Sequence, residues 1–310
     1  MRRSLVTGGA GFIGSHLVEA LLDRGDMVRV LDNFSSGKKE NLAGILDKIE
    51  LITADLQDQA SLVTALQDID LVYHQAAFVS GPLSIDEPEK CFAINVNGTV
   101  RLLEEAIKTG VKRVVLASSA AVYGDNPAVP LSENVGLDPK TPYATSKAVG
   151  ELYTRLYSDL LGLEVVALRY FNVFGPRQNP DSDYAAVIPI FVKNILDKEQ
   201  PTIFGDGHQT RDFIYIDDVV RANLFASEAD QAPGKIINIC SGLEISLLDL
   251  LDSLAEILGT DIQPIFEDER PGDIYRSAGD PTLARELLEY EPFVDLAEGL
   301  KKTAAWMNQS

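Results

Sequence analysis

The sequence predicts an α/β protein built on a doubly wound parallel sheet, with a smaller mixed α/β domain toward the carboxy-terminus. Short runs rich in Val, Ile and Leu alternate with helical segments from the first residues onward, and this alternation is typical of parallel βαβ units. The apolar runs carry almost no polar residues, which indicates strands covered by helices on both faces. After about Tyr170 the alternation loosens, so a less regular second domain is expected there.

Hydrophobic periodicity gives the elements in chain order. The expected strands are residues 5–7, 27–31, 49–53, 71–74, 114–118 and 165–170. The expected helices between them are 12–24, 59–66, 91–109 and 143–161, and later helices are expected near 246–258 and 281–288. We predict a first domain over 1–170 with a returning segment around 213–240, and a second domain from 171–212 and 241–310.

Composition limits the functions that the chain can have. A net charge of -20 argues against sequence-independent nucleic-acid binding, which needs a basic face. Cys91 and Cys240 lie far apart and His16, His74 and His208 have unrelated spacings, so no metal site or disulfide framework is predicted. No apolar stretch reaches the ~18 residues of a membrane span. We expect a cytoplasmic protein without a membrane anchor or signal peptide.

The first predicted strand leads directly into a glycine-rich turn. Gly8, Gly9, Gly11 and Gly14 lie between this strand and the first predicted helix. Glycine lets backbone amides and the helix amino-terminus approach a pyrophosphate closely. A dinucleotide site is therefore predicted here, and an ordinary tight turn is the alternative.

Polar or small residues follow the next strands. Asp32 closes the second strand, where a carboxylate accepts hydrogen bonds from an adenosine ribose and repels a ribose phosphate, so NAD is favoured over NADP. Asp55 and Leu56 follow the third strand and suit either the adenine edge or a simple turn. The fourth strand ends at His74-Gln75-Ala76-Ala77, where small residues allow backbone to lie against a cofactor.

Tyr143 and Lys147 are four residues apart on a predicted helix, so they share one face. A nearby ammonium favours the phenolate, which would bring the phenol toward its working range as a base. On its own this spacing also fits an ordinary helix face. Ser119 ends the fifth predicted strand and could share a proton with the phenol. The glycine turn, Ser119 and the Tyr-Lys pair occur in the order that one active site requires.

With these motifs the chain resembles the extended short-chain dehydrogenase/reductase superfamily and, within it, the nucleotide-sugar epimerases. The matching segments are TGGAGFIG, LDNFSSGKKENL, HQAA, NVNGT, SSAAVYG, YATSK, RYFNVFGPRQNP and ERPGD, and they extend over essentially the whole chain. The resemblance implies a Rossmann domain that retains NAD. It also implies removal of a hydride from sugar C4, rotation of the 4-keto sugar, and return of the hydride to the other face, interconverting UDP-glucose and UDP-galactose.

The resemblance also assigns residues. Tyr143 would be the base on O4, Lys147 would bind the nicotinamide ribose, and Ser119 would assist proton transfer. The implied cofactor residues are Gly8, Gly11, Phe12, Ile13, Gly14, Asp32, Asn33, Ser35, Ser36, Gly37, Asp55, Leu56, Gln75, Ala76, Ala77, Asn95, Ser118, Tyr143, Lys147, Tyr170 and Phe171. The implied substrate residues are Ser119, Tyr143, Asn172, Ala186, Val187, Thr202, Phe204, Arg211, Arg270, Asp273 and Ser277. For the arginines a surface salt bridge is the alternative, and for the apolar residues it is core packing.

Some positions narrow the subclass or depart from the pattern. Ala120 and Ala121 stand where sugar 4,6-dehydratases carry an Asp-Glu pair. Related decarboxylases also tend to carry a carboxylate there, so neither dehydration nor decarboxylation is expected. Leu83 replaces an arginine of many bacterial epimerases, which leaves the sugar contacts open. Ser277 stands where a small residue would leave room for an N-acetyl group, so UDP-N-acetylhexosamines are a further possible substrate.

Other functions remain open at this point. A nucleotide-sugar reductase or dehydrogenase would use the same residues with net cofactor turnover. A noncatalytic NAD-binding regulator would not need Ser119, Tyr143 and Lys147 together. A homodimer is expected because relatives pair the helices that correspond to 91–109 and 143–161.

Overall fold

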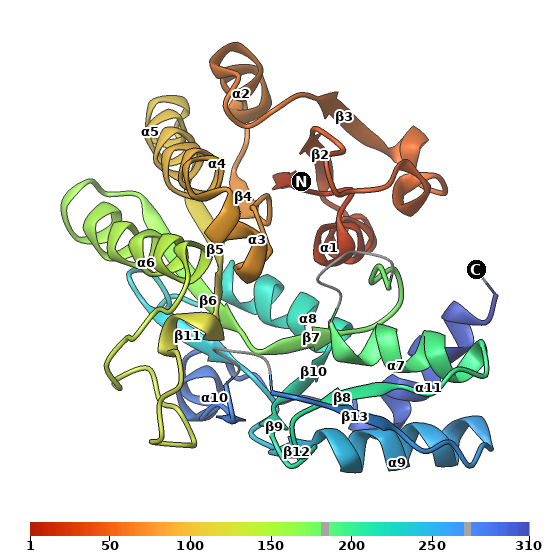
Figure 1. The fold of residues 1–310 in the computed structure, drawn as a ribbon. Coiled ribbons are helices and arrows are strands. Elements are labelled where there is room, and N and C mark those ends of the chain that lie inside the picture. The colour runs from red at the N-terminus through yellow and green to blue at the C-terminus, as the bar shows by residue number, and fades with distance from the viewer. Residues whose placement is uncertain (181–185, 270–273, 310) are drawn as a thin grey trace.

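The computed structural model describes residues 1–180, 186–269 and 274–309. Its main feature is a parallel sheet with the order β3-β2-β1-β4-β5-β6-β11 (Figure 1). The strands are β1 Arg3–Thr7, β2 Met27–Asp32, β3 Ile49–Thr53, β4 Leu71–His74, β5 Arg113–Ser119, β6 Glu164–Tyr170 and β11 Ile236–Ile239. The predicted doubly wound parallel sheet is confirmed.

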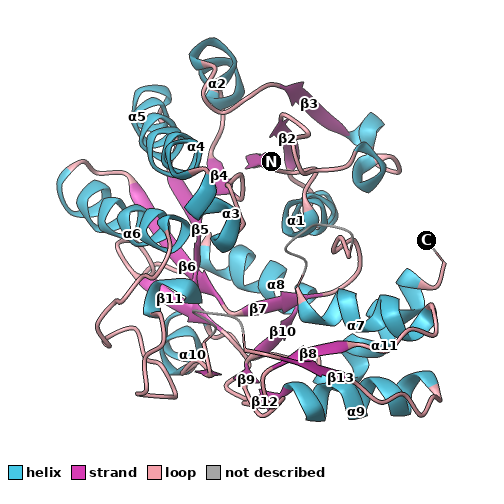
Figure 2. Ribbon diagram, in the orientation of Figure 1, coloured by secondary structure: helices cyan, strands magenta, loops and turns pink. Residues whose placement is uncertain are grey.

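Helices cover both faces of this sheet (Figures 1 and 2). Helices α1 (Phe12–Asp23) and α8 (Ile216–Ala226) share one buried cluster, which includes Leu17 and Val219. Helices α2 (Gln59–Leu66), α5 (Thr99–Thr109) and α6 (Pro142–Leu160) share another, which includes Leu62, Leu102 and Tyr157. Strands such as β4, β5 and β6 therefore bury both of their faces, which explains why they are almost wholly apolar, whereas the edge strand β3 is partly exposed.

The sheet has its switch point at β1. This strand pairs with β2 on one side and with β4 on the other, so the connections that follow β1 and β4 run to opposite faces. In open parallel sheets, ligands bind at the carboxyl ends of the strands beside such a point. The fold thus places the glycine turn after β1 and Ser119 at the end of β5 on one edge of the sheet.

The remaining elements form smaller sheets and helices below this edge in Figure 1. Three sheets have the orders β10-β7, β12-β9-β14 and β13-β8. Their strands are β7 Asn172–Phe174, β8 Thr202–Phe204, β9 Thr210–Arg211, β10 Phe213–Tyr215, β12 Ile245–Ser246, β13 Ile265–Glu267 and β14 Arg276–Ser277. The other helices here are α7 Val187–Leu196, α9 Leu247–Leu258, α10 Thr282–Leu288 and α11 Leu296–Met307.

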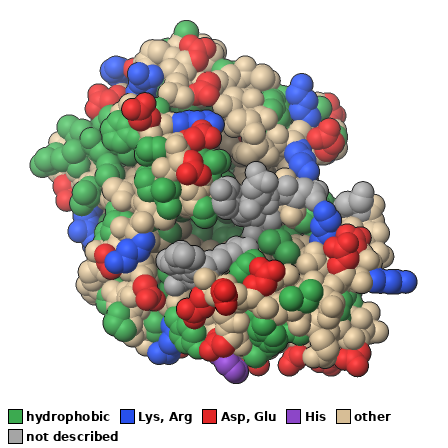
Figure 3. Space-filling model, in the orientation of Figure 1, with side chains coloured by type: hydrophobic (Ala, Val, Ile, Leu, Met, Phe, Trp, Pro, Cys, Tyr) green, Lys and Arg blue, Asp and Glu red, His purple; other side chains and the backbone are tan. Residues whose placement is uncertain are grey.

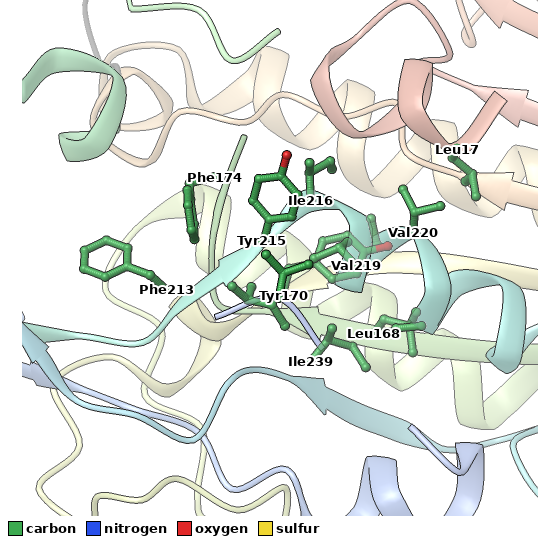
Figure 4. Packing of buried hydrophobic residues seen from close by; sticks show 14 of the residues in the cluster. Leu17, Leu168, Tyr170, Phe174, Phe213, Tyr215, Ile216, Val219, Val220 and Ile239 are labelled. Atoms are coloured by element: carbon green, nitrogen blue, oxygen red, sulfur yellow. The ribbon is translucent and has the colours of Figure 1, made fainter. Parts of the chain in front are cut away.

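One hydrophobic core joins the two regions. Figure 4 shows residues of this core, in which Phe174, Phe213 and Tyr215 of strands β7 and β10 belong together with Leu168 of β6 and Val219 of α8. The Phe174 ring meets the Tyr215 ring edge-on, with 5.5 Å between the ring centres. The predicted returning segment contains α8 and β11, and β11 pairs with β6. The division into two domains stays a prediction.

The prediction of one continuous helix over 91–109 is wrong, because the segment is divided. It divides into α4 (Pro88–Phe92), a π-helical turn η3 (Ala93–Gly98) and α5, and a short helix α3 (Gly81–Asp86) precedes it. Within η3, Asn95 exchanges hydrogen bonds with the backbone N–H and carbonyl of Phe78, at 2.7 and 3.0 Å. Hydrophobic periodicity cannot detect this local widening, because the apolar face continues through it.

Candidate active site

A cavity of about 940 Å³ runs along the carboxyl edge of the main sheet and onto the smaller sheets. Figure 3 shows the molecule hollowed near its centre on this side. The cavity wall contains the glycine turn, the ends of β2 and β4, Ser119, and residues of α6 and α7. It brings most of the predicted cofactor and substrate residues into one continuous site.

The glycine turn leaves no room for side chains. Gly8 has φ +70°, and a Cβ there would lie 2.7 Å from the backbone nitrogen of Ala76. A Cβ on Gly14 would lie 2.1 Å from the carbonyl oxygen of Gly8. Helix α1 begins after Gly11, which supplies no side-chain cap, so its first amides are available to a ligand. This cradle fits the pyrophosphate of a dinucleotide.

Asp32 lies beside the turn with its carboxylate buried. Its two oxygens accept hydrogen bonds from the backbone nitrogens of Ala10, at 2.8 Å, and Phe34, at 2.7 Å. These bonds fix the carboxylate, and each oxygen retains a lone pair for a ribose hydroxyl. Nearby, the Asn33 amide donates to Asp55 at 2.8 Å. All three side chains line the cavity, as expected for an adenosine site.

The three predicted catalytic residues meet in this cavity. Ser119 ends β5 near the phenol of Tyr143, and its hydroxyl acts to lower the pKa of that phenol. Tyr143 lies in the first turn of α6, which begins after Thr141, whose side chain caps the Ala144 amide at 3.1 Å. The ammonium of Lys147 donates to the carbonyl oxygen of Ala117 at 2.8 Å. Helix and strand are therefore joined where proton transfer is expected.

The ionisation of this pair differs from the sequence expectation. In the protein alone, burial raises the pKa of Tyr143 above its ordinary value, and the Ser119 hydrogen bond opposes that rise. Burial lowers the pKa of Lys147 to about 8. The predicted lowering of the tyrosine pKa by Lys147 is therefore not seen in the protein alone, because desolvation is the largest cause for both groups.

The end of β4 is held by a second buried network. His74 hydrogen-bonds Thr7 through Nδ1, at 2.7 Å, and Thr99 through Nε2, at 3.0 Å. The Thr99 hydroxyl donates its hydrogen to the Asn95 carbonyl, so it can only accept a hydrogen bond from His74. The neutral His74 ring is therefore protonated on Nε2. Burial lowers the pKa of His74 to about 3. This neutral histidine fixes the backbone that leads to Gln75.

Three predicted residues are absent from the described cavity wall. Asn95 is buried and binds Phe78 and, at 2.8 Å, Ser146, so it supports the wall from behind. A Cβ on Gly37 would lie 2.9 Å from the Ala10 backbone, so this glycine permits close packing. Ser277 is buried in β14 and pairs in register with Arg211. Sequence patterns identify the segment and not the direction of each side chain.

The substrate half of the wall is formed by the later strands and α7. Asn172, Ala186, Val187, Thr202, Phe204 and Arg211 all line the cavity. The Arg211 guanidinium donates to the carbonyl oxygen of Thr210 at 2.9 Å. Arg270 and Asp273 lie outside the described residues.

The prediction missed several wall residues, of which Arg177 is the most prominent. Its guanidinium pairs with Glu19 at 2.6 Å and contacts Ser15 at 3.3 Å, and both partners are on α1. Lys38, Asn41, Val79, Ile94, Gln178, Asn179 and Gln209 also line the cavity. The signal for Arg177 was the GPRQNP segment, in which an arginine follows a strand in an acidic chain.

Two searches of the described ranges gave negative results. Among residues 1–180, 186–269 and 274–309, no group of three or more His, Cys, Asp or Glu side chains is placed to hold a metal ion. Within the same ranges, the helices are too short or too polar to cross a membrane.

The sheet order, the glycine cradle and the Ser-Tyr-Lys set define a dinucleotide-binding α/β enzyme. Comparison with known proteins agrees: the model of the NAD dependent epimerase/dehydratase family matches residues 4–240. The chain belongs to this family, so it is an enzyme of the epimerase type and NAD is its cofactor, as predicted.

Similar proteins extend over the full chain. A UDP-glucose 4-epimerase of Mycolicibacterium smegmatis is 43% identical over 306 residues, covering 97% of each chain. The structure of a UDP-N-acetylglucosamine 4-epimerase from Methanobrevibacter ruminantium, in complex with UDP-N-acetylmuramic acid, has a TM-score of 0.95 at 42% identity, covering 99% of this chain and 98% of that one. The Thermotoga maritima UDP-glucose 4-epimerase with UDP-glucose has a TM-score of 0.94 at 39% identity, covering 99% of both.

The relatives do not share a single activity. A UDP-N-acetyl-alpha-D-glucosaminuronate decarboxylase of Bacillus cytotoxicus is 34% identical over 320 residues, covering 99% of this chain and 98% of the relative. Family membership therefore establishes the fold and the cofactor, and the reaction has to be argued from the site.

Proposed function

We propose that the protein is an NAD-dependent 4-epimerase that interconverts UDP-glucose and UDP-galactose, with UDP-N-acetylhexosamines as further substrates. The observation that carries this proposal is one cavity whose wall contains the glycine cradle, the Ser119-Tyr143-Lys147 set and Arg211. The relatives named as UDP-glucose and UDP-N-acetylglucosamine 4-epimerases support it.

The cavity has charges suited to two diphosphates. In a chain of net charge -20, its described wall includes Lys38, Lys147, Arg177 and Arg211. Guanidinium groups suit phosphate because they can donate two parallel hydrogen bonds. We assign the cradle end to the dinucleotide and the Arg211 end to the diphosphate of the UDP-sugar.

The chain's own groups carry out the proton transfers. Bound NAD supplies a hydride acceptor and donor for sugar C4. The phenol oxygen of Tyr143 accepts the proton of the C4 hydroxyl. It returns this proton after the 4-keto sugar has rotated in the site to present its other face. The Ser119 hydroxyl, which lines the same cavity as this phenol, orients the sugar oxygen. In the protein alone burial raises the pKa of Tyr143; the Lys147 ammonium, together with the positive charge of the oxidised nicotinamide, would favour the phenolate when NAD is bound.

Dehydration and decarboxylation are disfavoured by the residues after Ser119. Ala120 and Ala121 occupy the 3-10 turn η4 (Ala120–Tyr123) and are partly exposed beside the site. Their methyl groups cannot move a proton at C5 or C6. A reductase or dehydrogenase stays the alternative, because it would use the same proton-transfer residues.

A single incubation separates these functions. Purified protein is mixed with UDP-galactose without added NAD, and the products and the NADH absorbance are followed together. Conversion to UDP-glucose without net NADH change is expected. Consumption of sugar only in step with added cofactor would instead favour the reductase or dehydrogenase.

We also propose a homodimer formed through α6. Leu152, Leu156 and Leu160 are exposed at four-residue spacing on this helix, and Figure 3 shows hydrophobic side chains over it at the left edge. An exposed apolar stripe of this kind is typical of helix pairing. Light scattering after size exclusion would show twice the chain mass.

A further inference from the structure

Helix α6 carries a buried carboxylate one turn beyond its two catalytic residues. Tyr143, Lys147 and Glu151 are spaced four apart and therefore lie on one helix face. Glu151 is only 2% exposed and is not among the described residues of the cavity wall. A charge buried this deeply so close to a proton-transfer site needs a physical explanation.

The Glu151 carboxylate holds the ends of two strands. It accepts from the Ser118 hydroxyl at 2.6 Å and from Arg169 through Nε and Nη2, at 2.7 Å each. Ser118 and Arg169 face each other in the register of β5 and β6, and the next pair is Ser119 with Tyr170. One carboxylate thus joins α6 to both strands at the residues that directly precede Ser119 and Tyr170.

Arg169 extends this network to the other side of Ser119. Its Nη1 donates to the Tyr123 hydroxyl at 2.7 Å, and the guanidinium lies 4.7 Å from the centre of the Tyr123 ring. The Tyr123 hydroxyl donates in turn to Asn238 of β11 at 2.7 Å. Because Tyr123 ends η4, which begins directly after Ser119, the chain is anchored both before and after this serine.

Stability alone is a weak explanation for such a pair. Arg169 and Glu151 are both 2% exposed, and burying two charges costs several kcal/mol per ion that their attraction only partly repays. A directional, bidentate pair does fix the relative position of the elements it joins. Here the elements are the strand that ends in Ser119 and the helix that carries Tyr143.

We propose that Glu151 is a positioning residue: paired with Arg169, it sets the position of α6 against β5, and with it the position of the Tyr143 phenol relative to the Ser119 hydroxyl. The Lys147 bond to Ala117 is a second link between the same helix and strand. The kinetic test of this inference rests on the proposed function. The spectroscopic test does not, because it follows Tyr143 itself and not the reaction.

The kinetic test compares Glu151→Gln with a matched control, Glu164→Gln. Glu164 pairs with Arg113 at 2.7 Å at the opposite end of the same two strands. We expect Glu151→Gln to lower kcat on the order of 100-fold, the cost of a misplacement of about 1 Å, with unchanged NAD content and KM. The control is expected to keep kcat. Equal kcat in wild type and Glu151→Gln, or an equal loss in the control, would overturn the inference.

The spectroscopic test follows the pKa of Tyr143 directly. Fluorotyrosine is incorporated into the NAD-loaded protein, and the signal is assigned with Tyr143→Phe. If the Ser119 hydroxyl moves away from the phenol, it lowers the pKa of Tyr143 less and that pKa rises, whereas the mere loss of a nearby negative charge would lower it. An increase in Glu151→Gln supports positioning, and a decrease or no change refutes it. This result stands even if the wild type has no epimerase activity, in which case only the proposed function fails.

A milder variant covers the case in which Glu151→Gln does not fold. Ser118→Ala removes one bond to Glu151 and leaves the Arg169 pair intact. A smaller kcat loss with the same upward pKa shift is expected. An unshifted Tyr143 in folded Ser118→Ala would then refute the inference.

Discussion

The ammonium nitrogen of Lys147 lies 5.8 Å from the ring centre of Tyr143 while it is bonded to the carbonyl oxygen of Ala117. The lysine is thus anchored on β5 rather than free to follow the phenol. Ser119, whose hydroxyl acts to lower the pKa of Tyr143, ends the same strand. Strand β5 therefore sets the position of both groups that act on the tyrosine.

Replacing Tyr143 with Phe should nearly abolish turnover. The change removes the proton-transfer oxygen and retains the ring, so we expect kcat to fall about 1,000-fold, within the range for general acid-base catalysis. KM for UDP-galactose and NAD content should stay unchanged. Full activity in this variant, measured by product formation at several pH values, would contradict the proposed role.

Replacing Gly14 with Ala should prevent cofactor binding. The new Cβ would lie 2.1 Å from the Gly8 carbonyl oxygen, which no ordinary contact allows, so the cradle must open. We expect purified Gly14→Ala protein to contain little NAD. Gly44→Ala is the matched control, because nothing lies within 4 Å of a Cβ there. The prediction fails if both variants retain the same NAD content.

The buried His74 should make stability depend on pH. Its folded pKa, about 3, lies below the ordinary 6.5, so below pH 6.5 the unfolded chain binds a proton that the folded protein does not. The free energy of unfolding should then decrease by about 1.4 kcal/mol per pH unit as pH falls from about 6.5 toward 3.

A difference measurement isolates this histidine from other groups. Burial raises the pKa of Asp212 to about 6, so Asp212 opposes the trend between the ordinary carboxyl pKa and pH 6. Its contribution cancels when wild type is compared with His74→Gln by urea unfolding. The stability advantage of wild type should shrink as pH falls below 6.5. A constant difference would show that His74 takes up its proton in the folded state.

Ser277→Tyr should narrow the substrate range. Ser277 lies beside Arg211 in the register of β14 and β9, and a tyrosine there is expected to take the space of an N-acetyl group. Steady-state assays should show loss of UDP-N-acetylglucosamine turnover with UDP-glucose turnover retained. If Ser277→Tyr turned over UDP-N-acetylglucosamine as fast as wild type, the assignment of Ser277 to the sugar site would be wrong.

Much of the fold could be predicted because its signals are local. Strands β3 and β4 and helix α2 have the expected bounds, since apolar runs and periodic segments each reflect a single element. The glycine turn was equally clear, because Gly8 and Gly14 are required by backbone contacts. The widened turn at Asn95 was missed because its cause is a partner in another segment, Phe78.

The parts of the site that could not be predicted depend on distant pairing. Arg177 reaches the cavity through partners on α1 that lie far from it in the sequence. Nothing in the 17 residues between Glu151 and Arg169 indicates that these two side chains form a buried pair. The cofactor roles of Asn95 and Gly37 stay predictions from a motif, which could not indicate that Asn95 binds Ser146 or that Gly37 packs against the Ala10 backbone.

The late position of β11 in the chain has a practical consequence for dissecting this protein. This strand follows the whole first part of the substrate-side region, yet it completes the main sheet beside β6. A fragment that ends before residue 236 would leave the backbone of β6 as an open edge, which is prone to intermolecular pairing and aggregation. The cofactor half should therefore be expressed with the segment that crosses back to it, or not separated at all.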